Sequence, residues 1–387
     1  MLSRDAVWKT LDGYDLDRLK LGVVASHSAL DVCDGAVDED LPSVAYCQKG
    51  REATYARYMR TVRQNGKRVA GCVDEAVVLD RFSEVTSDEV QSRMVEENTL
   101  FVPNRSFSSY CALETIEERF RVPLLGSRNM LRTEERTEER DYYWLLEKAG
   151  LPFPDPIASP DEIRELSIVK LHHAQKALER GFFTAATPAE YHEKADKLLK
   201  EGVIDQASLD EARIERYVIG PVFNFNFFYS PVSAASGDME PVELLGVDWR
   251  FESSLDGHVR LPAPQQMNLP AHQLVPEMTV VGHNSATARE SLLDKVYDLA
   301  ERFVAAAKEH YDPGIIGPFC LQTCVDKDLD FYIYDVAPRI GGGTNVHVAV
   351  GHPYGNALWR TNMSSGRRIA REVRRAVDAD MLRSLVT

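Results

Sequence analysis

The sequence has few cysteines, and their spacing points neither to a disulfide framework nor to a zinc site. Its six cysteines in 387 residues include no C-x-x-C pair, and Cys320 and Cys324, four residues apart, have no second pair to complete a tetrahedral site. We therefore expect free, buried thiols and a protein of the reducing cytoplasm.

Positive charge in excess and long apolar runs are also absent. The formal net charge of −15 argues against a protein that mainly binds nucleic acid or an anionic membrane surface, because both require a basic footprint. No apolar stretch approaches the ~20 residues that span a bilayer, and the polar start of the chain is unlike a secretory signal. We expect a cytoplasmic protein without a membrane or nucleic-acid partner, although a small anion in a local basic pocket stays possible.

What the sequence does contain is alternating strand and helix patterns, in a length that calls for two or three subdomains. Within the first 125 residues, short β-branched runs at 21–25, 43–47, 77–79 and 100–102 alternate with amphipathic stretches, which predicts a parallel sheet. Further on, runs at 217–229, 242–247 and 259–261 predict antiparallel strands. This change of pattern predicts a boundary near Gly126.

A hairpin near the C-terminus carries the clearest chemical signal. Residues 319–324 and 331–336 read as strands, and a turn centred between Asp328 and Leu329 would place Gln322 directly opposite Asp335. Two oxygen-bearing side chains that close can share a hard cation such as Mg²⁺. A polar cross-strand pair that faces solvent is the alternative.

Three other motifs carry groups that bind anions. Arg339 precedes three glycines, which either let the backbone approach a ligand or form a simple tight turn. His27 follows a buried strand at the start of a helix, where free N–H groups favour anions, although a lone histidine is often structural. Lys170 ends an apparent strand, in a position to reach nucleotide phosphates or simply to lie on the surface.

Several stretches together resemble one family along the whole chain. They are ASHSAL (25–30), KGRE (49–52), ELLGVDWRFESSLDGHVRLPA (243–263), ARESLL (288–293), GIIGPFCLQ (314–322), PRIGGGTN (338–345) and GRRIAREV (366–373). The chain thus resembles the archaeal formate-dependent 5-formaminoimidazole-4-carboxamide ribonucleotide synthetases. The resemblance implies an ATP-grasp fold, α/β and α+β in class, preceded by a small parallel α/β domain. The implied units are residues 1–125, a nucleotide-binding subdomain at 126–215 and a metal- and substrate-binding subdomain at 216–387.

The activity implied by the resemblance is an ATP-dependent carboxylate–amine ligation in purine biosynthesis. Formate would take the γ-phosphoryl group of ATP to give formyl phosphate, because formate itself has a poor leaving group. The amine of aminoimidazole carboxamide ribonucleotide (AICAR) would then attack the formyl carbon, with release of ADP and phosphate. Mg²⁺ or Mn²⁺ is the implied cofactor, and the family implies a homo-oligomer.

The resemblance also implies a role for individual residues. Arg339 and His27 would be catalytic, and Gln322 and Asp335 would hold the metal. The implied substrate contacts are His27, Ser28, Ser106, Ser254, Arg289 and Asn345. The implied ATP contacts are Lys170, Glu215 on a linker, Val218 and Arg132.

The chain departs from the family pattern where ligands are expected. The family's glycine-rich ATP loop is reduced at 171–181 to Gly181, so side chains such as Lys176 and Arg180 would have to replace backbone contacts to phosphate. Asn104 and Arg105 stand where the family has His-Gly, and Asp335 is commonly glutamate. The hypotheses left open are a formate–AICAR ligase, a diverged ligase with another amine or acid, and a non-catalytic nucleotide-binding protein.

Overall fold

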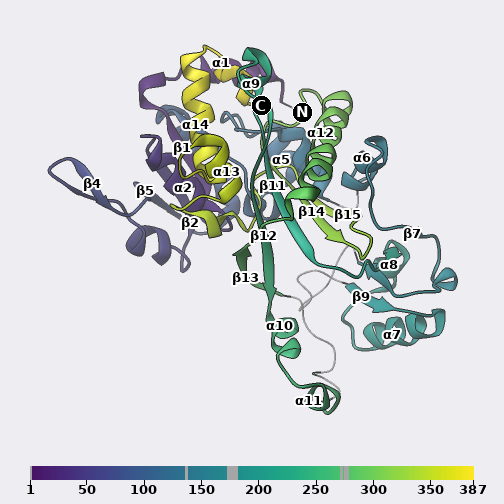
Figure 1. Cartoon of the computed structure of the whole chain (residues 1–387). Helices are drawn as coiled ribbons and strands as arrows, with labels where there is room; N and C mark the ends of the chain where they lie inside the picture. Colours follow the sequence, from purple (N-terminus) through teal and green to yellow (C-terminus); the bar gives the residue numbers. More distant parts are fainter. Residues whose placement is uncertain (1, 136–137, 172–181, 271–272, 274–278) are drawn as a thin grey trace.

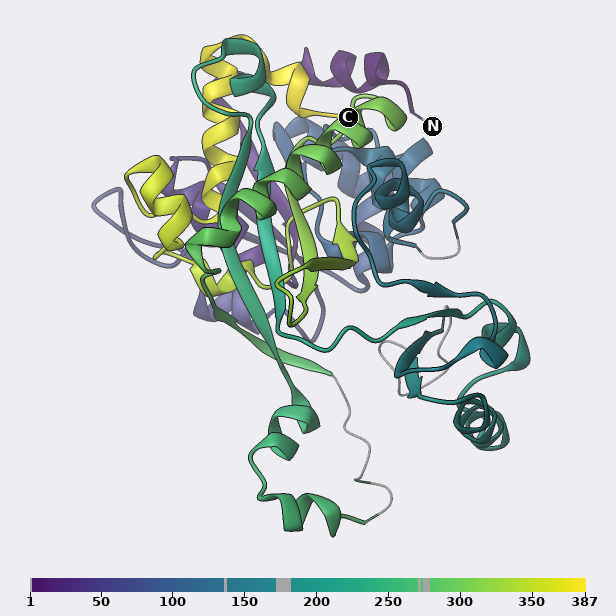
Figure 2. The same cartoon turned by 45° about the vertical axis from the view of Figure 1, so that its right-hand side comes forward.

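The computed structural model describes residues 2–135, 138–171, 182–270, 273 and 279–387. Within these ranges the strands form four sheets. Figures 1 and 2 show most of the chain as one large upper body, with a smaller unit at its side. No helix among the described residues is both long and apolar enough to cross a membrane.

The N-terminal sheet is parallel, as the alternating pattern predicts. Its strand order is β5-β2-β1-β6, and every neighbouring pair runs in the same direction. Because the crossover helices return each strand to the same side, the carboxyl ends of all four strands lie along one edge. The bounds are β1 Lys20–Val24, β2 Ser43–Gln48, β5 Glu75–Leu79 and β6 Thr99–Val102, with α2 Ala29–Asp38 and α3 Asp88–Glu96 between strands.

The C-terminal helix α14 (Ser365–Asp378) packs on α2, so the two ends of the chain share one core. Two glycines make this contact close: a Cβ on Gly35 would overlap the backbone of Arg367, and one on Gly366 would overlap the carbonyl of Asp31. The start of α2, which carries the residues that follow β1, is therefore fixed against the C-terminal region.

A smaller antiparallel sheet, β7-β10-β8-β9, forms the unit at the side of the body in Figure 2. Its own apolar cluster includes Ile163, Val169 and Tyr191. The bounds are β7 Pro156–Ile157, β8 Ser167–Lys170, β9 Phe182–Ala185, β10 Arg213–Arg216, α7 Pro188–Lys200 and α8 Gln206–Asp210.

The largest sheet is antiparallel, in the order β13-β12-β11-β14-β15. One face packs on α12 (Leu293–His310) through Phe227, Phe303 and Phe319, so the other face is left for polar side chains. The bounds are β11 Val222–Tyr229, β12 Val242–Glu252, β13 Val280–Ser285, β14 Gly317–Val325 and β15 Phe331–Ala337.

One strand prediction is wrong. Residues 259–261 are not a strand, because β12 ends at Glu252 and helix α10 (Ser253–Val259) follows it. With α11 (Ala263–Met267), α10 extends away from the body at the bottom of Figure 1. The remaining elements are α1 Arg4–Leu11, β3 Val62–Gln64, β4 Lys67–Ala70, α4 Arg105–Tyr110, α5 Leu113–Glu118, α6 Tyr142–Lys148, α9 Pro231–Ser236 and α13 Pro353–Trp359.

Candidate functional site

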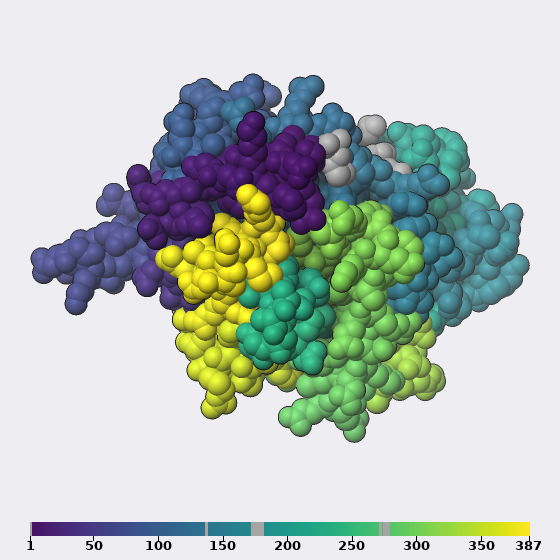
Figure 3. Space-filling model, turned by 90° about the horizontal axis from the view of Figure 1, so that it is seen from above, coloured from purple at the N-terminus to yellow at the C-terminus, as the bar shows by residue number. Residues whose placement is uncertain are grey.

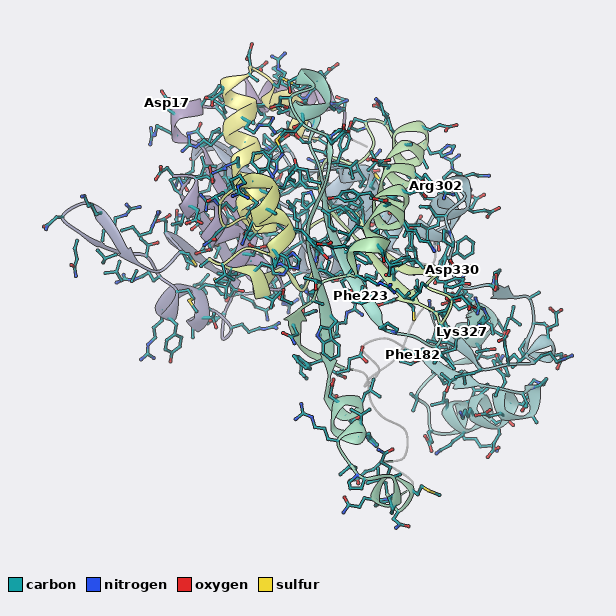
Figure 4. The ribbon with its side chains drawn as sticks, in the orientation of Figure 1. Asp17, Phe182, Phe223, Arg302, Lys327 and Asp330 are labelled. Atoms are coloured by element: carbon teal, nitrogen blue, oxygen red, sulfur yellow. The ribbon has the colours of Figure 1, made fainter. Side chains whose placement is uncertain are left out.

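Gln322 on β14 lies directly opposite Asp335 on β15, as the hairpin pattern predicts. The reason is less simple than a symmetric hairpin, however, because Val325 pairs with Phe331 and the turn is therefore centred on Asp328. A bulge at Tyr334 adds one residue to β15 and brings Asp335 back opposite Gln322. Figure 4 labels Lys327 and Asp330 in this turn.

Gln322 and Asp335 belong to a row of polar residues that crosses the whole sheet. Ser285 pairs with Asp248, Asp248 with Asn224, Asn224 with Gln322, and Gln322 with Asp335. Directly paired residues share one face of an antiparallel sheet, so all five side chains lie on the face opposite α12. This face is the floor of the candidate site.

The centre of the floor is held by a buried carboxylate. Asp248 is fully buried and accepts hydrogen bonds from Asn224 Nδ2 at 2.8 Å and Asn226 Nδ2 at 2.6 Å. The alternation Asn224-Phe-Asn226 on β11 is a period-2 signal that could have revealed this polar face, and it was missed.

Arg250 on β12 reaches across the row and donates to Gln322 Oε1. Burial acts to lower the pKa of Arg250, but Tyr334 and Asp335 more than offset that effect and its pKa is raised. The site therefore contains a guanidinium cation beside both predicted metal-binding side chains.

A second cation, Arg339, is held by a carboxylate that no sequence motif indicated. Arg339 Nη2 donates to Glu134 Oε1 at 2.6 Å, and each side chain is only 7% exposed. Arg105 Nη1 lies 3.7 Å from Glu134 Oε2 and 3.1 Å from Glu135 Oε1. Burial raises the pKa of the Glu134 carboxyl, and nearby Asp335 raises it further, against the opposing effect of the two arginines.

Two of the three glycines after Arg339, Gly341 and Gly343, are required by protein side chains. A Cβ on Gly341 would overlap Asn226 Oδ1, and a Cβ on Gly343 would overlap the Asp248 carboxylate. A Cβ on Gly342 would lie 3.3 Å from His27 Nδ1. The turn is thus packed between the polar floor and the N-terminal domain, which explains its glycines without a ligand.

His27, Ser28 and Asn345 come together at the start of α2. Asn345 Nδ2 donates to the His27 carbonyl at 2.6 Å, and its Oδ1 accepts from the Asp31 N–H at 3.1 Å. Ser28 Oγ donates to the Gly341 carbonyl. Asn345 therefore acts as a cap for α2 from a distant segment, and His27 lies at the carboxyl end of β1 with a left-handed φ of 48°.

Ser106 and Asn104 follow the neighbouring strand β6. The Ser106 hydroxyl is buried and has no hydrogen-bond partner among the described residues, so it is available to a ligand. Asn104 is fully used: its Nδ2 donates to the carbonyls of Val24 and Ser26, and its Oδ1 accepts from the Phe107 N–H.

Lys170 and Glu215 form a buried ion pair between β8 and β10. Lys170 Nζ also donates to Tyr143 Oη at 2.6 Å and lies 3.4 Å from the Tyr334 carbonyl on β15, so it connects the small sheet to the hairpin of β14 and β15. The prediction that Glu215 lies on a linker is wrong, because Glu215 belongs to strand β10. Val218 does lie on the linker between β10 and β11, where its carbonyl accepts a hydrogen bond from Cys324 Sγ at 3.3 Å.

Three other candidates lie outside this cluster. Arg132 is held by carboxylates, with Glu117 at 2.9 Å and Glu138 at 2.8 Å, and no described contact joins it to Lys170. Ser254 lies in α10, on the extension below the body, and Arg289 is exposed before α12. The altered ATP loop at 172–181 lies outside the described residues.

Comparisons with known proteins bear on the family and the fold of the chain. Two family models match, one described as a protein of unknown function (DUF1246) over residues 21–157 and one as a domain of unknown function (DUF1297) over residues 190–387. The chain is 40% identical to the 5-formaminoimidazole-4-carboxamide-1-(β)-D-ribofuranosyl 5′-monophosphate synthetase of Methanopyrus kandleri and 36% identical to that of Methanocaldococcus jannaschii. Each match covers 100% of both chains.

Two solved structures are also similar to this chain. The IMP biosynthesis protein PurP from Thermococcus kodakaraensis is similar with a TM-score of 0.69 and 29% identity, covering 95% of this chain and 100% of that one. The ADP complex of N5-carboxyaminoimidazole ribonucleotide synthetase has a TM-score of 0.57 at 12% identity, covering 89% of this chain and 77% of that one. This second likeness shows the ATP-grasp fold alone.

Proposed function

The chain belongs to the family of 5-formaminoimidazole-4-carboxamide ribonucleotide synthetases, and from this premise we propose that it formylates AICAR with formate and ATP in IMP biosynthesis. The observation that supports this most directly is the facing pair Gln322 and Asp335, surrounded by Arg250, Arg105 and Arg339. Oxygen donors and cations at one place suit a nucleotide triphosphate and a small carboxylate.

The reaction balances as two transfers. A formate oxygen attacks the γ-phosphorus of ATP, the bond to the β-phosphate oxygen breaks, and ADP leaves with formyl phosphate behind. The AICAR amine then attacks the formyl carbon, the carbon–oxygen bond to phosphate breaks, and the amine gives up a proton. The task of the protein is to position the reactants and neutralise charge.

Gln322 and Asp335 fit a divalent cation by their chemistry. Amide and carboxylate oxygens are the donors that Mg²⁺ or Mn²⁺ accepts, and the pairing puts both at the same height on one face. A bound cation would neutralise charge on the phosphate oxygens of ATP. Gln322 Oε1 accepts from Arg250 in this structure, so cation binding requires the guanidinium to move to another acceptor, for which phosphate is well suited.

We assign the nucleotide substrate to the carboxyl edge of the N-terminal sheet. His27 and Ser28 follow β1 there and Ser106 follows β6, and the buried Ser106 hydroxyl has no hydrogen-bond partner in the described part of the chain. The Gly341–Gly343 turn and Asn345 join this edge to the polar floor that carries Arg339. The AICAR amine and the formyl group would meet between these two surfaces.

We propose that ATP binds beside Lys170 and the linker that carries Val218, next to the hairpin of β14 and β15. The proposed units are residues 1–125, 126–215 and 216–387, and the proposed setting is the cytoplasm, with a homo-oligomer as the assembled form. Arg132, Ser254 and Arg289 would reach ligands only if the chain rearranged or a second subunit contributed them.

The test is ADP release by the purified protein with formate and AICAR, added singly and together. We expect ADP only when both are present, together with one equivalent of the formamido nucleotide. ADP release with another acid or amine, and none with AICAR, would favour a diverged ligase. Arg105 motivates that alternative, because it adds a guanidinium beside Glu134 where the family has a glycine.

A further inference from the structure

Arg105 brings a third guanidinium to the candidate site, beside those of Arg250 and Arg339. It is the first residue of α4, in the segment that follows β6. Its Nη1 donates to Glu135 Oε1 at 3.1 Å and lies 3.7 Å from Glu134 Oε2. Arg105 therefore joins the carboxyl-end edge of the N-terminal sheet to the carboxylate that holds Arg339.

Most of the hydrogen-bond donors of Arg105 are unused. Only Nη1 makes a hydrogen bond to a described residue, so Nε and Nη2 have no partner in that part of the chain. A guanidinium presents its N–H groups in a planar fork that matches the two oxygens of a carboxylate. The side chain is 35% exposed, against 7% for Arg339, so Arg105 is the more accessible of the two to an anion from solvent.

The hairpin of β14 and β15 acts on Arg105 through Asp335. Burial acts to lower the pKa of Arg105, but the neighbouring carboxylates, with Glu134 first among them and Asp335 included, outweigh that effect and the pKa is raised. Because Asp335 is the proposed ligand of the cation, Arg105 lies within electrostatic reach of the place where the γ-phosphate of ATP would be held.

Two substrates, the acid and AICAR, carry an anionic group that Arg105 could bind. The acid has to approach the γ-phosphorus, because a bond forms between them. The amine of AICAR has to reach the same place, but the ribose and the imidazole ring separate that amine from the 5′-phosphate. The position of Arg105 beside Glu134 and Asp335 therefore favours the acid.

We propose that Arg105 binds the carboxylate of the acid substrate together with Arg339, with one guanidinium on each side of Glu134. This inference rests on the proposed function. Glu134 offsets the repulsion between the two cations, and a small acid such as formate takes the N–H donors of Arg105 that the protein leaves unused. Because these donors face the acid, Arg105 governs the affinity for the acid and not the affinity for ATP.

The experiment compares R105A and R105K with the wild type by steady-state ADP release, with formate varied at saturating ATP and AICAR. R105A should raise the KM for formate roughly tenfold, because the carboxylate loses a charged hydrogen-bond donor, and should leave the KM for ATP and for AICAR within about twofold. R105K keeps the charge without the planar fork and should recover part of the loss.

The matched control is R18A, which removes one positive charge at an exposed position before β1, at the amino-end edge of the sheet. Figure 4 labels the neighbouring Asp17 at the top of the molecule, away from Lys327 and Asp330 in the hairpin turn. Figure 3 shows the purple N-terminal segment on that upper surface. We expect R18A to keep the wild-type constants, and circular dichroism melts establish that each variant is folded.

An unchanged KM for formate in R105A overturns this inference, and ADP release by the wild type then leaves the proposed function standing. A rise in the KM for AICAR in place of the KM for formate would assign Arg105 to the nucleotide and overturn the inference as well. A fall in kcat alone would indicate a structural role, with the same consequence.

A second measurement needs no turnover. Each protein is melted with Mg-ADP in sodium formate and in sodium chloride of equal ionic strength. A rise in Tm that is specific to formate, present in the wild type and absent in R105A, supports the site. An equal rise in both proteins, or none in the wild type, overturns it. A wild type that binds formate in this way but releases no ADP with formate and AICAR refutes the proposed function alone.

Discussion

Arg339 donates to Glu134 at 2.6 Å across 205 residues of sequence, and both side chains are buried. Arg339 Nη1 also donates to the Ile340 carbonyl at 2.8 Å, so the guanidinium is anchored at two points, whereas its Nε has no partner among the described residues. Glu134 thereby fixes the orientation of the guanidinium, and we propose it as a positioning residue for an anion that Arg339 binds.

We expect Glu134→Gln to lower kcat roughly 10- to 100-fold, because the weaker anchor lets Arg339 leave its working position. The KM for ATP should change little, whereas the KM for formate should rise. Glu135→Gln is the matched control, since Glu135 contacts Arg105 but no described contact joins it to Arg339. Equal losses in the two variants, measured by steady-state ADP release, would contradict a specific role for Glu134.

Asp335→Ala should abolish turnover, by at least about 100-fold, while the fold is retained. The half-buried carboxylate lies on the polar face of β15, where its proposed role is to hold a cation, and the apolar face of the hairpin would keep its packing. Asp328→Ala, in the exposed turn of the same hairpin, is the control and should keep wild-type activity. Normal turnover of Asp335→Ala would show that the cation is held elsewhere.

The buried pair of Arg368 and Glu243 should be important for stability. Arg368 donates to Glu243 at 2.7 Å and 2.9 Å, and the side chains are 0% and 1% exposed. Replacing Glu243 with Gln removes a negative charge that neutralises the buried guanidinium. We therefore expect a loss of about 3 kcal/mol in the free energy of unfolding by urea. Asp12→Asn, which breaks the exposed pair with Arg383, is the control and should lower the free energy of unfolding far less, because solvent screens that pair.

Asp31 should make the stability depend on pH below neutrality. It is fully buried where α2 meets α14, and burial raises its pKa from 3.8 to about 6, with Asp34 contributing and the hydrogen bond from the Gly366 N–H opposing the shift. Between pH 4 and 6 the folded state keeps a proton that the unfolded state has lost, so this group lowers stability as pH rises through that window.

The size of this effect is as much as about 3 kcal/mol, from the shift of roughly two pKa units. Asp31→Asn keeps an acceptor for the Gly366 N–H and does not ionise. We therefore expect the variant to be more stable than the wild type at pH 7 and the difference to vanish near pH 4. A difference in the free energy of unfolding by urea that stays the same between pH 4 and pH 7 would contradict the assignment.

The sequence by itself determined the elements and the pairing that define the hairpin of β14 and β15. Strands β1, β2, β5 and β6 follow from short apolar runs, and Gln322 faces Asp335 because a period-2 pattern and a local turn set the register of neighbouring strands. Even there, the turn is centred one half-residue away from the expected place, and only the bulge at Tyr334 restores the pairing.

Tertiary structure alone decided what surrounds that pair. Glu134 lies in a run of charged residues that looks like a solvated surface, yet it is buried against Arg339. Arg250 meets Gln322, and the Gly341–Gly343 turn packs on Asn226 and Asp248, through strand neighbours far apart in sequence. Local patterns encode which face of an element is apolar, but the partner of a buried charge depends on how the elements pack.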